Sequence, residues 1–352
     1  MTMGRTALDR SMKHRLERIA LGTGRFGTVI GLLILVVVFT VLKPNVFPTI
    51  RNLLNILNQI SLLGICATGL TICLVMKEFD LSIGAVATLG AVLTAGWIPH
   101  MHPVLAVLAV LAVCATIGLI SGLVITTLRV SSFMTTLGMM TVLTGFSYWY
   151  TSGSGSILYS GIPKGFLQIG RGAFLSIPYL VFVMAAVLVT LHVLLNHTTT
   201  GRRMYAVGGS PEAARFAGIP TTRLKVVGFM LSGTLAGLTG VLLVARLGLA
   251  EPTIGNRFLF DAFTVAFLGA ASVYVGRFHI VGTLIGTLIM GTIFNGFTLL
   301  DVPYHLQLVV QGAILITAVT SAGLWQGLLH TVRLRAVRQE PNDEGEASDV
   351  EQ

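Results

Sequence analysis

Apolar stretches separated by short polar segments repeat along most of the chain, from about residue 26 to residue 322. About 20 apolar residues in a helix cross the roughly 30 Å hydrocarbon core of a bilayer. The pattern therefore predicts an all-α, polytopic membrane protein with about ten transmembrane helices. We place the spans near residues 26–42, 59–76, 81–99, 104–128, 130–150, 178–195, 226–245, 262–275 (the shortest), 280–300 and 307–322.

Composition supports this prediction. Only 11% of the 352 residues are charged, 54% are hydrophobic, and the mean hydropathy is +0.84. A soluble protein of this composition would expose large apolar patches to water. The formal net charge of +9 could suggest nucleic-acid binding. However, the basic residues fall between apolar runs and not on one compact face, so we expect no nucleic-acid partner.

The basic residues predict the orientation of the chain. With the N-terminus inside the cell, seventeen of the 23 lysines and arginines lie on the cytoplasmic side, as the positive-inside rule requires. We expect a multi-pass membrane protein with both termini in the cytoplasm. Residues 1–25 are predicted to form a basic cytoplasmic segment before a retained first helix, 26–322 a transmembrane domain with the cytoplasmic loop 196–225, and 323–352 an acidic, disordered cytoplasmic tail.

Two spacing patterns concern how the spans pack. Gly27/Gly31, Gly118/Gly122, Gly233/Gly237 and Gly282/Gly286 are four residues apart, which predicts close helix crossings, although glycine is also simply common in membrane helices. Asp80 is followed by the tripeptide Leu89-Gly90-Ala91, and Asp261 is followed by a tripeptide of the same sequence, Leu268-Gly269-Ala270. This suggests an inverted repeat that relates spans 2–5 to spans 7–10, with a solute path near the midplane. The alternative is a chance similarity, because identity between the halves is low.

The polar loop 196–225 contains the signals of a short, separately capped helix. Ser210 is a suitable N-cap, Pro211 fits the first helical position, and Glu212 opposes the positive helix end. Gly218 is a natural left-handed terminator, and Pro220 prevents the helix from continuing. A helix of two turns is not stable alone, so we interpret it as a docking element.

The chain lacks the motifs of an enzyme. It contains no Gly-Lys dipeptide and hence no P-loop, and it has no His-Glu-x-x-His, Cys-x-x-Cys or nucleophile-elbow motif. We therefore expect no catalytic residue, no metal site and no cofactor. The carboxylates fall in the tails or at span ends, which predicts no acidic group inside the membrane and disfavours an ion-coupled carrier.

Neutral polar residues remain within the spans and suit a hydroxyl-rich, uncharged solute. The candidates for the translocation path are Asn55, Asn58, Gln59, Asn295 and Gln307. The alternative for each is a hydrogen bond between helices. Residues 77–82 are predicted to form a tight cytoplasmic turn in which Asp80 caps the third span, or else to contact a cytoplasmic partner.

Several segments resemble one family. Residues 52–59 (Asn-Leu-Leu-Asn-Ile-Leu-Asn-Gln), Asp80-Leu-Ser-Ile-Gly84, Thr200–Arg203, Ala206–Gly209, Glu212–Ala214, Gly218-Ile219, Gly282–Gly286 and Asn295-Gly296 carry the likeness. From about residue 52 to 324 the chain resembles the membrane permeases of bacterial ABC importers for monosaccharides, the ribose-type group of the binding-protein-dependent permease superfamily. Residues 77–79 and 269–278 depart from the family pattern.

The resemblance implies three partners: an ABC ATPase subunit, an extracytoplasmic solute-binding protein, and a second permease copy or homologue. It also implies that the loop 196–225 couples to the ATPase through Gly201, Arg202, Arg203, Glu212, Ala213, Ala214 and Gly218, and that Asp80, Ser82 and Gly84 form a signature at the cytoplasmic turn. We expect a non-enzymatic permease subunit for a small polar solute, a monosaccharide by resemblance. The alternatives are an ABC permease for branched-chain amino acids or nucleosides, or an ion-coupled secondary transporter.

Overall fold

The computed structural model describes residues 27–153, 161–272 and 276–320. The predicted N-terminal segment, the acidic tail and the ends of three expected spans lie outside these residues. The elements are the helix Gly27–Leu42, α2 (Ile50–Val75), α3 (Ile83–Trp97), α4 (Pro103–Thr127), α5 (Ser132–Tyr150), α6 (Lys164–Arg171), β1 (Ala173–Phe174), β2 (Ile177–Pro178), α7 (Tyr179–His197), α8 (Thr199–Gly209), α9 (Pro211–Phe216), α10 (Thr221–Leu247), α11 (Arg257–Ala270), α12 (Ile280–Leu299) and the helix Tyr304–Thr320.

The fold is all-α and polytopic, as predicted, and each of the ten expected spans coincides with a helix. Within the described residues, five helices are long and apolar enough to cross a membrane by themselves: α2, α4, α7, α10 and α12. Shorter apolar helices include Gly27–Leu42, α3 and Tyr304–Thr320. The prediction missed α6 and the small antiparallel hairpin β1–β2, because they are too short to give a periodic signal.

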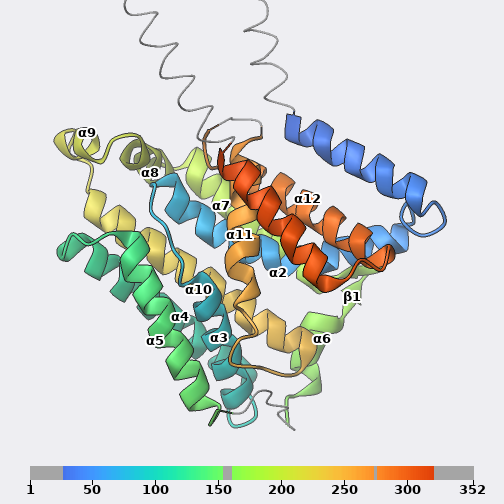
Figure 1. Ribbon diagram of the computed structural model, residues 1–352. Coiled ribbons are helices and arrows are strands. Elements are labelled where there is room, and N and C mark those ends of the chain that lie inside the picture. Colours follow the sequence, from blue (N-terminus) through green and yellow to red (C-terminus); the bar gives the residue numbers. More distant parts are fainter. Residues whose placement is uncertain (1–26, 154–160, 273–275, 321–352) are drawn as a thin grey trace, which may run out of the picture.

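Helix α2 is the centre of the bundle. In the most apolar 18-residue stretch of α2, 83% of the residues are buried. The corresponding share is 67% for α10 and α12 and 28% for α4 and α7. Helices α10, α11, α12 and α7 all pack on α2, and α10 also packs on α3 and α4. Figure 1 shows α2 crossing behind α11 and α12. The outer helices α4 and α7 consequently present apolar faces to lipid.

Glycine pairs make the closest crossings. A Cβ at Gly122 would lie 2.8 Å from the Val226 Cα, and one at Gly233 would lie 2.5 Å from the Cys114 carbonyl oxygen, so α4 and α10 meet backbone to backbone. Gly282 and Gly286 likewise contact α11. Three predicted pairs are thus confirmed as packing positions. The prediction is wrong for Gly27/Gly31, since no atom lies within 4 Å of a Cβ built at either.

The packing agrees with the suggested inverted repeat. Helix α10 packs on α3 and α4, while α2 packs on α11 and α12. Glu78, just after α2, pairs with Lys225, near the start of α10, so α2 and α10 run in opposite directions. The short helices α3 and α11 each follow a non-helical segment, at 76–82 and 248–256. This is the pattern expected when α2, α3 and α4 correspond to α10, α11 and α12.

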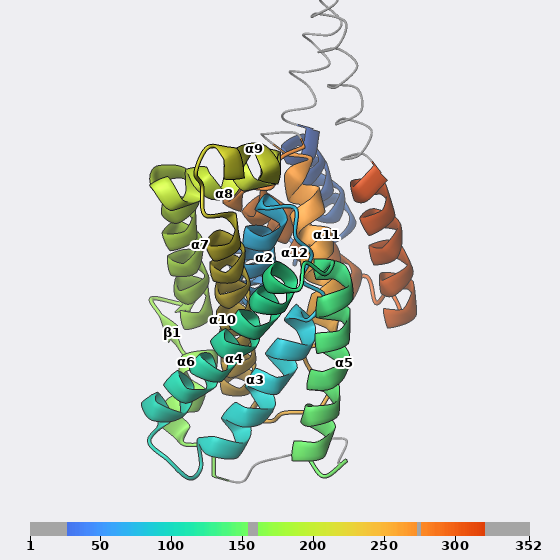
Figure 2. The same cartoon turned by 90° about the vertical axis from the view of Figure 1, so that its left-hand side faces the viewer.

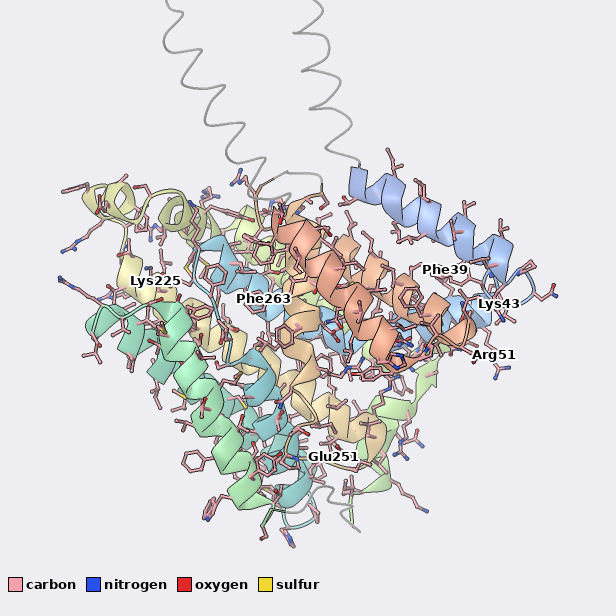
Figure 3. All side chains as sticks on the ribbon, in the orientation of Figure 1. Phe39, Lys43, Arg51, Lys225, Glu251 and Phe263 are labelled. Carbon is pink, nitrogen blue, oxygen red and sulfur yellow. The ribbon has the colours of Figure 1, made fainter. Side chains whose placement is uncertain are left out.

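Segments predicted to be cytoplasmic gather at one end of the bundle, which we call the coupling end: residues 77–82, 128–131, 196–225 and 276–279. Figure 2 shows α8 and α9 at the end opposite α6. Figure 3 places Lys225 near α9, while Lys43, Arg51 and Glu251 lie well away from it.

Candidate functional site

Helix α9 projects from the coupling end and has the predicted caps. Ser210 Oγ accepts a hydrogen bond from the Ala213 amide at 3.2 Å, and Pro211 occupies the first turn with Glu212. Gly218 has φ +74°, and the Ile219 amide donates to the Ala214 carbonyl at 3.0 Å, which closes the helix. These local predictions are confirmed.

One side of α9 faces solvent. Ala214 is buried, whereas Glu212, Ala213 and Arg215 are exposed. Phe216 is 93% exposed, and it lies four residues after Glu212 on the same face. Sequence reasoning missed Phe216, although an aromatic residue in a capped helix of six residues was a signal for an anchor in a partner's pocket.

Helix α8 connects α9 to the bundle. Gly208 packs against the Val75 carbonyl at the end of α2, and Gly201 packs against the carbonyls of Leu194 and Leu195 in α7. Any side chain at these glycines would collide with backbone, so α8 packs directly on α2 and α7. Gly201 is therefore a packing residue, while Arg202 and Arg203 are exposed.

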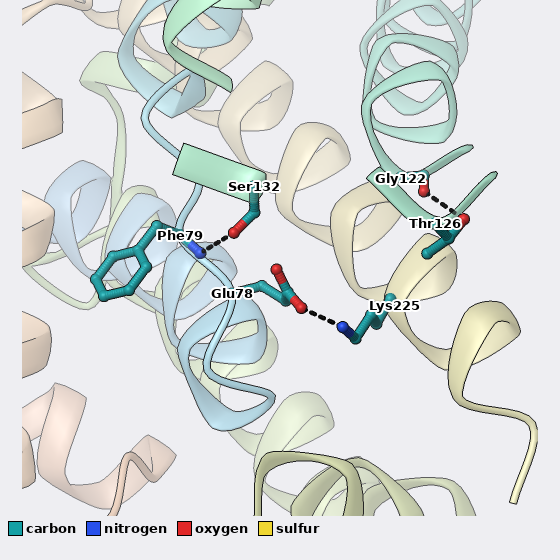
Figure 4. Close-up of polar contacts among 6 residues, drawn as sticks. All are labelled: Glu78, Phe79, Gly122, Thr126, Ser132 and Lys225. Carbon is teal, nitrogen blue, oxygen red and sulfur yellow. Dashed lines mark hydrogen bonds and ion pairs between the residues drawn. The ribbon is translucent and has the colours of Figure 1, made fainter. Parts of the chain in front are cut away.

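The segment after α2, residues 76–82, enters the bundle as non-helical chain. Glu78 forms an ion pair with Lys225, and the Phe79 amide donates to Ser132 Oγ at 3.1 Å (Figure 4). The Leu81 amide donates to Thr136 Oγ1 at 3.0 Å. Hydroxyls of α5 thus satisfy the backbone of this segment where no helix does.

Asp80 is the deepest polar group of this segment. It is 3% exposed, and its carboxylate accepts from the Ser82 amide at 3.0 Å, from Ser82 Oγ at 2.6 Å and from Ser232 Oγ of α10 at 2.7 Å. The predicted capping role is wrong, because Ser82 is the N-cap of α3 and makes no side-chain cap bond. Asp261 in α11 is also buried. The prediction of no acidic group within the bundle is therefore wrong as well.

The starts of α3 and α11 meet inside the bundle. A Cβ on Gly84 would lie 3.0 Å from the Gly255 carbonyl oxygen, and the Gly255 amide donates to Thr88 Oγ1 at 2.9 Å. Gly84 is thus required for a backbone contact between the two halves of the chain. A pair of short helices that begin within the bundle is a feature of transporter sites.

A cavity of about 280 Å³, which we call the central cavity, lies between α2, α10, α11 and α12. Apolar side chains line most of it, and the polar lining is Gln59, Arg246, Arg257 and Asp261. Asp261 pairs with Arg257 at 3.6 Å and accepts from Gln311 Nε2, while Arg246 Nη1 donates to the Asn58 carbonyl at 3.4 Å. A cavity with an apolar wall and a few convergent polar groups is typical of a site for a small polar molecule.

The predicted path residues do not all reach this cavity. Gln59 lines it, and Asn58 contacts Arg246 through its backbone. Asn295 and Asn52 exchange two side-chain hydrogen bonds of 2.9 and 3.0 Å that join α12 to α2. Gln307 donates to the Val302 carbonyl at 2.9 Å, and Asn55 is exposed. Asn295 and Gln307 thus fit the alternative of internal hydrogen bonding.

Comparison with known proteins identifies the relatives of this chain. Residues 52–319 match the family described as "Branched-chain amino acid transport system / permease component". The chain is 42% identical to the ribose import permease protein RbsC of Bacillus subtilis over 84% of this chain and 91% of that protein. It is 38% identical to RbsC of Escherichia coli K12, over 83% and 91%, and 33% identical to the L-arabinose ABC transporter permease protein AraH of Azospirillum brasilense, over 84% and 86%. No solved structure matches the chain.

Proposed function

The chain belongs to the branched-chain amino acid transport system permease component family, and on that premise we propose that it is the membrane subunit of an ABC importer for a monosaccharide. Its relatives named as ribose and L-arabinose permeases support the sugar assignment. It conducts the solute, and ATP hydrolysis belongs to a separate chain, since this sequence has no P-loop.

The projection of α9 at the coupling end carries this proposal. A helix of six residues with an almost fully exposed phenylalanine needs a partner surface to cover it. We assign that surface to the ATPase, with Phe216 as the anchor and Glu212, Ala213 and Arg203 around it, while Arg202 faces the cavity beside α7. Gly218 ends the helix, and Ala214 faces the protein itself.

We propose that movement of α9 is transmitted to the solute path through direct contacts between helices. Helix α8 carries α9 and is locked to the end of α2 at Gly208. Helix α2 in turn supplies Gln59 to the central cavity. The ion pair of Glu78 and Lys225 joins the turn after α2 to α10, which supplies Arg246 to the same cavity. Closure of the ATPase would therefore shift α2 and α10 relative to α11 and α12.

The central cavity is the proposed solute site. Sugar hydroxyls both donate and accept hydrogen bonds, and the carboxylate of Asp261, the amide of Gln59 and the guanidinium of Arg246 offer both kinds of partner. Of the path residues predicted from sequence, Gln59 and Asn58 stay in this proposal. Asp80, Ser82 and Gly84 hold α3 in place beside the cavity and do not contact the solute.

The assembly and orientation are part of the proposal. The subunit pairs with a second permease copy or homologue, receives solute from an extracytoplasmic binding protein, and lies in the bacterial inner membrane with its coupling end and both termini in the cytoplasm. The positive-inside distribution supports this orientation, since the basic segments share that end. Among the described residues that line the central cavity, the one carboxylate, that of Asp261, is in an ion pair with Arg257, which favours a neutral solute over a cation.

The test is uptake into cells that carry this permease with its ATPase and binding protein as the only route for pentoses. Labelled ribose and L-arabinose should enter, and uptake should survive an uncoupler but stop when ATP is depleted. Transport of a branched-chain amino acid or a nucleoside in place of a sugar would replace the solute assignment. Uptake abolished by the uncoupler while ATP persists would instead indicate an ion-coupled carrier.

A further inference from the structure

A second and larger cavity, of about 650 Å³, opens at the coupling end between α7, α8 and the start of α12. It is separate from the central cavity and shares no lining residue with it. Its polar lining includes Arg202, Arg277, His192, His197 and Asn196, and no carboxylate is among the described residues that line it. A cavity that concentrates cationic and donor groups in this way attracts an anion.

The arginines are available to such an anion. In the described part of the chain, the ion pairs are those of Glu78 with Lys225 and of Arg257 with Asp261, so neither Arg202 nor Arg277 has a carboxylate partner there. The Arg277 guanidinium lies 4.8 Å from the centre of the Tyr205 ring, which positions it at the wall of the cavity. Tyr205 is held by donating its hydroxyl to the Phe278 carbonyl at 3.1 Å.

Helix α12 begins at this cavity. His279 lines it and is the N-cap, where its Nδ1 accepts from the Gly282 amide at 2.9 Å. The 20 residues of α12 therefore direct the positive end of their dipole toward the cavity. A helix N-terminus and unpaired guanidinium groups together favour a phosphate oxygen over other anions, because both donate to a multiply charged acceptor.

The outer face of α7 indicates where that phosphate comes from. Val189 and Val193 are 62% and 46% exposed, and they lie on the same helical face as His192 and Asn196 of the cavity. Phe182, which is 45% exposed, lies about two turns before Val189 and continues this apolar strip away from the coupling end. A cationic cavity directly above an apolar strip on a lipid-facing helix has the amphipathic form of a phospholipid.

We propose that this cavity binds the phosphate headgroup of an anionic phospholipid, with the acyl chains lying along Val193, Val189 and Phe182 of α7. Arg277 and Arg202 bind the phosphate, and the N-terminus of α12 adds to their field. The bound lipid occupies the space between α7, α8 and α12, and so it fixes α8 against the bundle. The proposal does not depend on which solute the permease carries.

The experiment is native mass spectrometry of the full-length protein in mixed micelles of phosphatidylglycerol and phosphatidylcholine, together with the variants Arg277→Gln and Arg202→Gln. The protein should retain phosphatidylglycerol selectively, and each variant should weaken retention about fivefold, the effect expected for one arginine near an anionic membrane surface. Arg51→Gln, an exposed arginine near the start of α2, is the matched control and should retain lipid like the unmodified protein.

Three results would overturn the proposal. Equal retention of the two lipids would show that the cavity has no headgroup preference. Displacement of phosphatidylglycerol by excess inorganic phosphate alone would identify a soluble phosphate as the ligand. Unchanged retention by both cavity variants would place the lipid elsewhere, and if the same variants instead lost binding of the ATPase in detergent, the cavity would belong to the protein interface. A melting temperature for each variant confirms that it is folded.

Discussion

The carboxylate of Asp80 accepts a hydrogen bond of 2.7 Å from the hydroxyl of Ser232, and this contact joins the non-helical segment before α3 to the middle of α10. Asp80 and Ser232 are both buried, and Ser232 is the donor to the Asp80 carboxylate oxygen that Ser82 does not reach. The pair connects the two halves of the chain at the level where α3 begins.

Loss of the Ser232 hydroxyl should destabilise the protein. Ser232→Ala leaves one oxygen of Asp80 without its donor in the interior, which costs about 1–3 kcal/mol. We expect a lower melting temperature in detergent. Ser147→Ala is the matched control, because the Ser147 hydroxyl is equally buried but bonds only the Leu143 carbonyl of its own helix. If Ser147→Ala lowered the melting temperature as much as Ser232→Ala, the hydrogen bond between Ser232 and Asp80 would not be the cause of the loss.

Removal of the Phe216 ring should uncouple transport without affecting folding. Phe216 is 93% exposed and contributes nothing to the interior, so Phe216→Ala should insert and melt normally. Loss of an aromatic anchor from an interface typically costs 2 kcal/mol or more, which corresponds to at least about thirtyfold weaker ATPase binding. Co-purification of the ATPase measures this effect. Phe146→Ala, at a 53% exposed position of α5, is the control and should bind the ATPase normally.

Two further changes test the shape and charge of α9. Gly218→Val places a β-branched residue at φ +74°, which costs of the order of 1–3 kcal/mol and should displace the helix end. Glu212→Lys reverses the charge at the first turn. Both variants should insert but lose solute-stimulated ATPase activity. Normal uptake by either variant would refute a docking role for α9.

The central cavity gives a prediction about solute affinity. Gln59→Leu removes a donor and an acceptor from the cavity wall, and an unpaired sugar hydroxyl should then raise the KM for uptake about tenfold. Asn55→Leu changes an exposed residue one turn earlier in α2 and should leave the KM unaltered. If the two variants behave alike, the solute does not pass Gln59.

The N-cap of α12 should make stability pH-dependent. Burial lowers the pKa of the His279 imidazole to about 4 from its ordinary value of 6.5, and the positive charges of Arg277 and His192 act in the same direction. The unfolded chain therefore binds a proton near pH 6.5 that the folded protein does not bind until about pH 4. Stability is retained above pH 6.5 and falls as the pH drops through that window, by up to about 3 kcal/mol.

The variant His279→Asn separates the cap from the titration. Asparagine accepts the Gly282 amide bond as an N-cap but does not ionise. Its melting temperature should match that of the unmodified protein near neutral pH and should fall less between pH 6.5 and 5. An unchanged pH profile would assign the titration to another group.

Local signals in the sequence predicted local structure well. The spans follow from runs of apolar residues, and the caps of α9 follow from Ser210, Pro211 and Gly218, because each acts within a few positions of the chain. Contacts across the bundle were harder to predict. Gly118/Gly122 and Gly27/Gly31 have the same spacing, yet only the first pair meets another helix.

The depth of Asp80, Arg246 and Asp261 was predicted wrongly from the sequence. Asp80 follows a charged turn, and Arg246 and Asp261 lie near span ends, so their positions along the chain suggested the membrane surface. In the structure the segments 76–82 and 248–256 run into the bundle as turns and irregular chain and carry neighbouring polar groups inward. A hydropathy profile treats each apolar stretch as one continuous helix that crosses the membrane. It therefore assigns the wrong depth to residues where that helix is interrupted.

The contact of Gly84 with Gly255 has a consequence for the synthesis of this protein. Residues 50–150 enter the membrane before α10 and α11 have been translated, so Asp80 must wait for Ser232, and Thr88 for the Gly255 amide. During that interval a polar stretch of backbone lies in the membrane without its final partners, which is costly in hydrocarbon. The nascent first half should therefore remain beside the insertion machinery until the second half arrives.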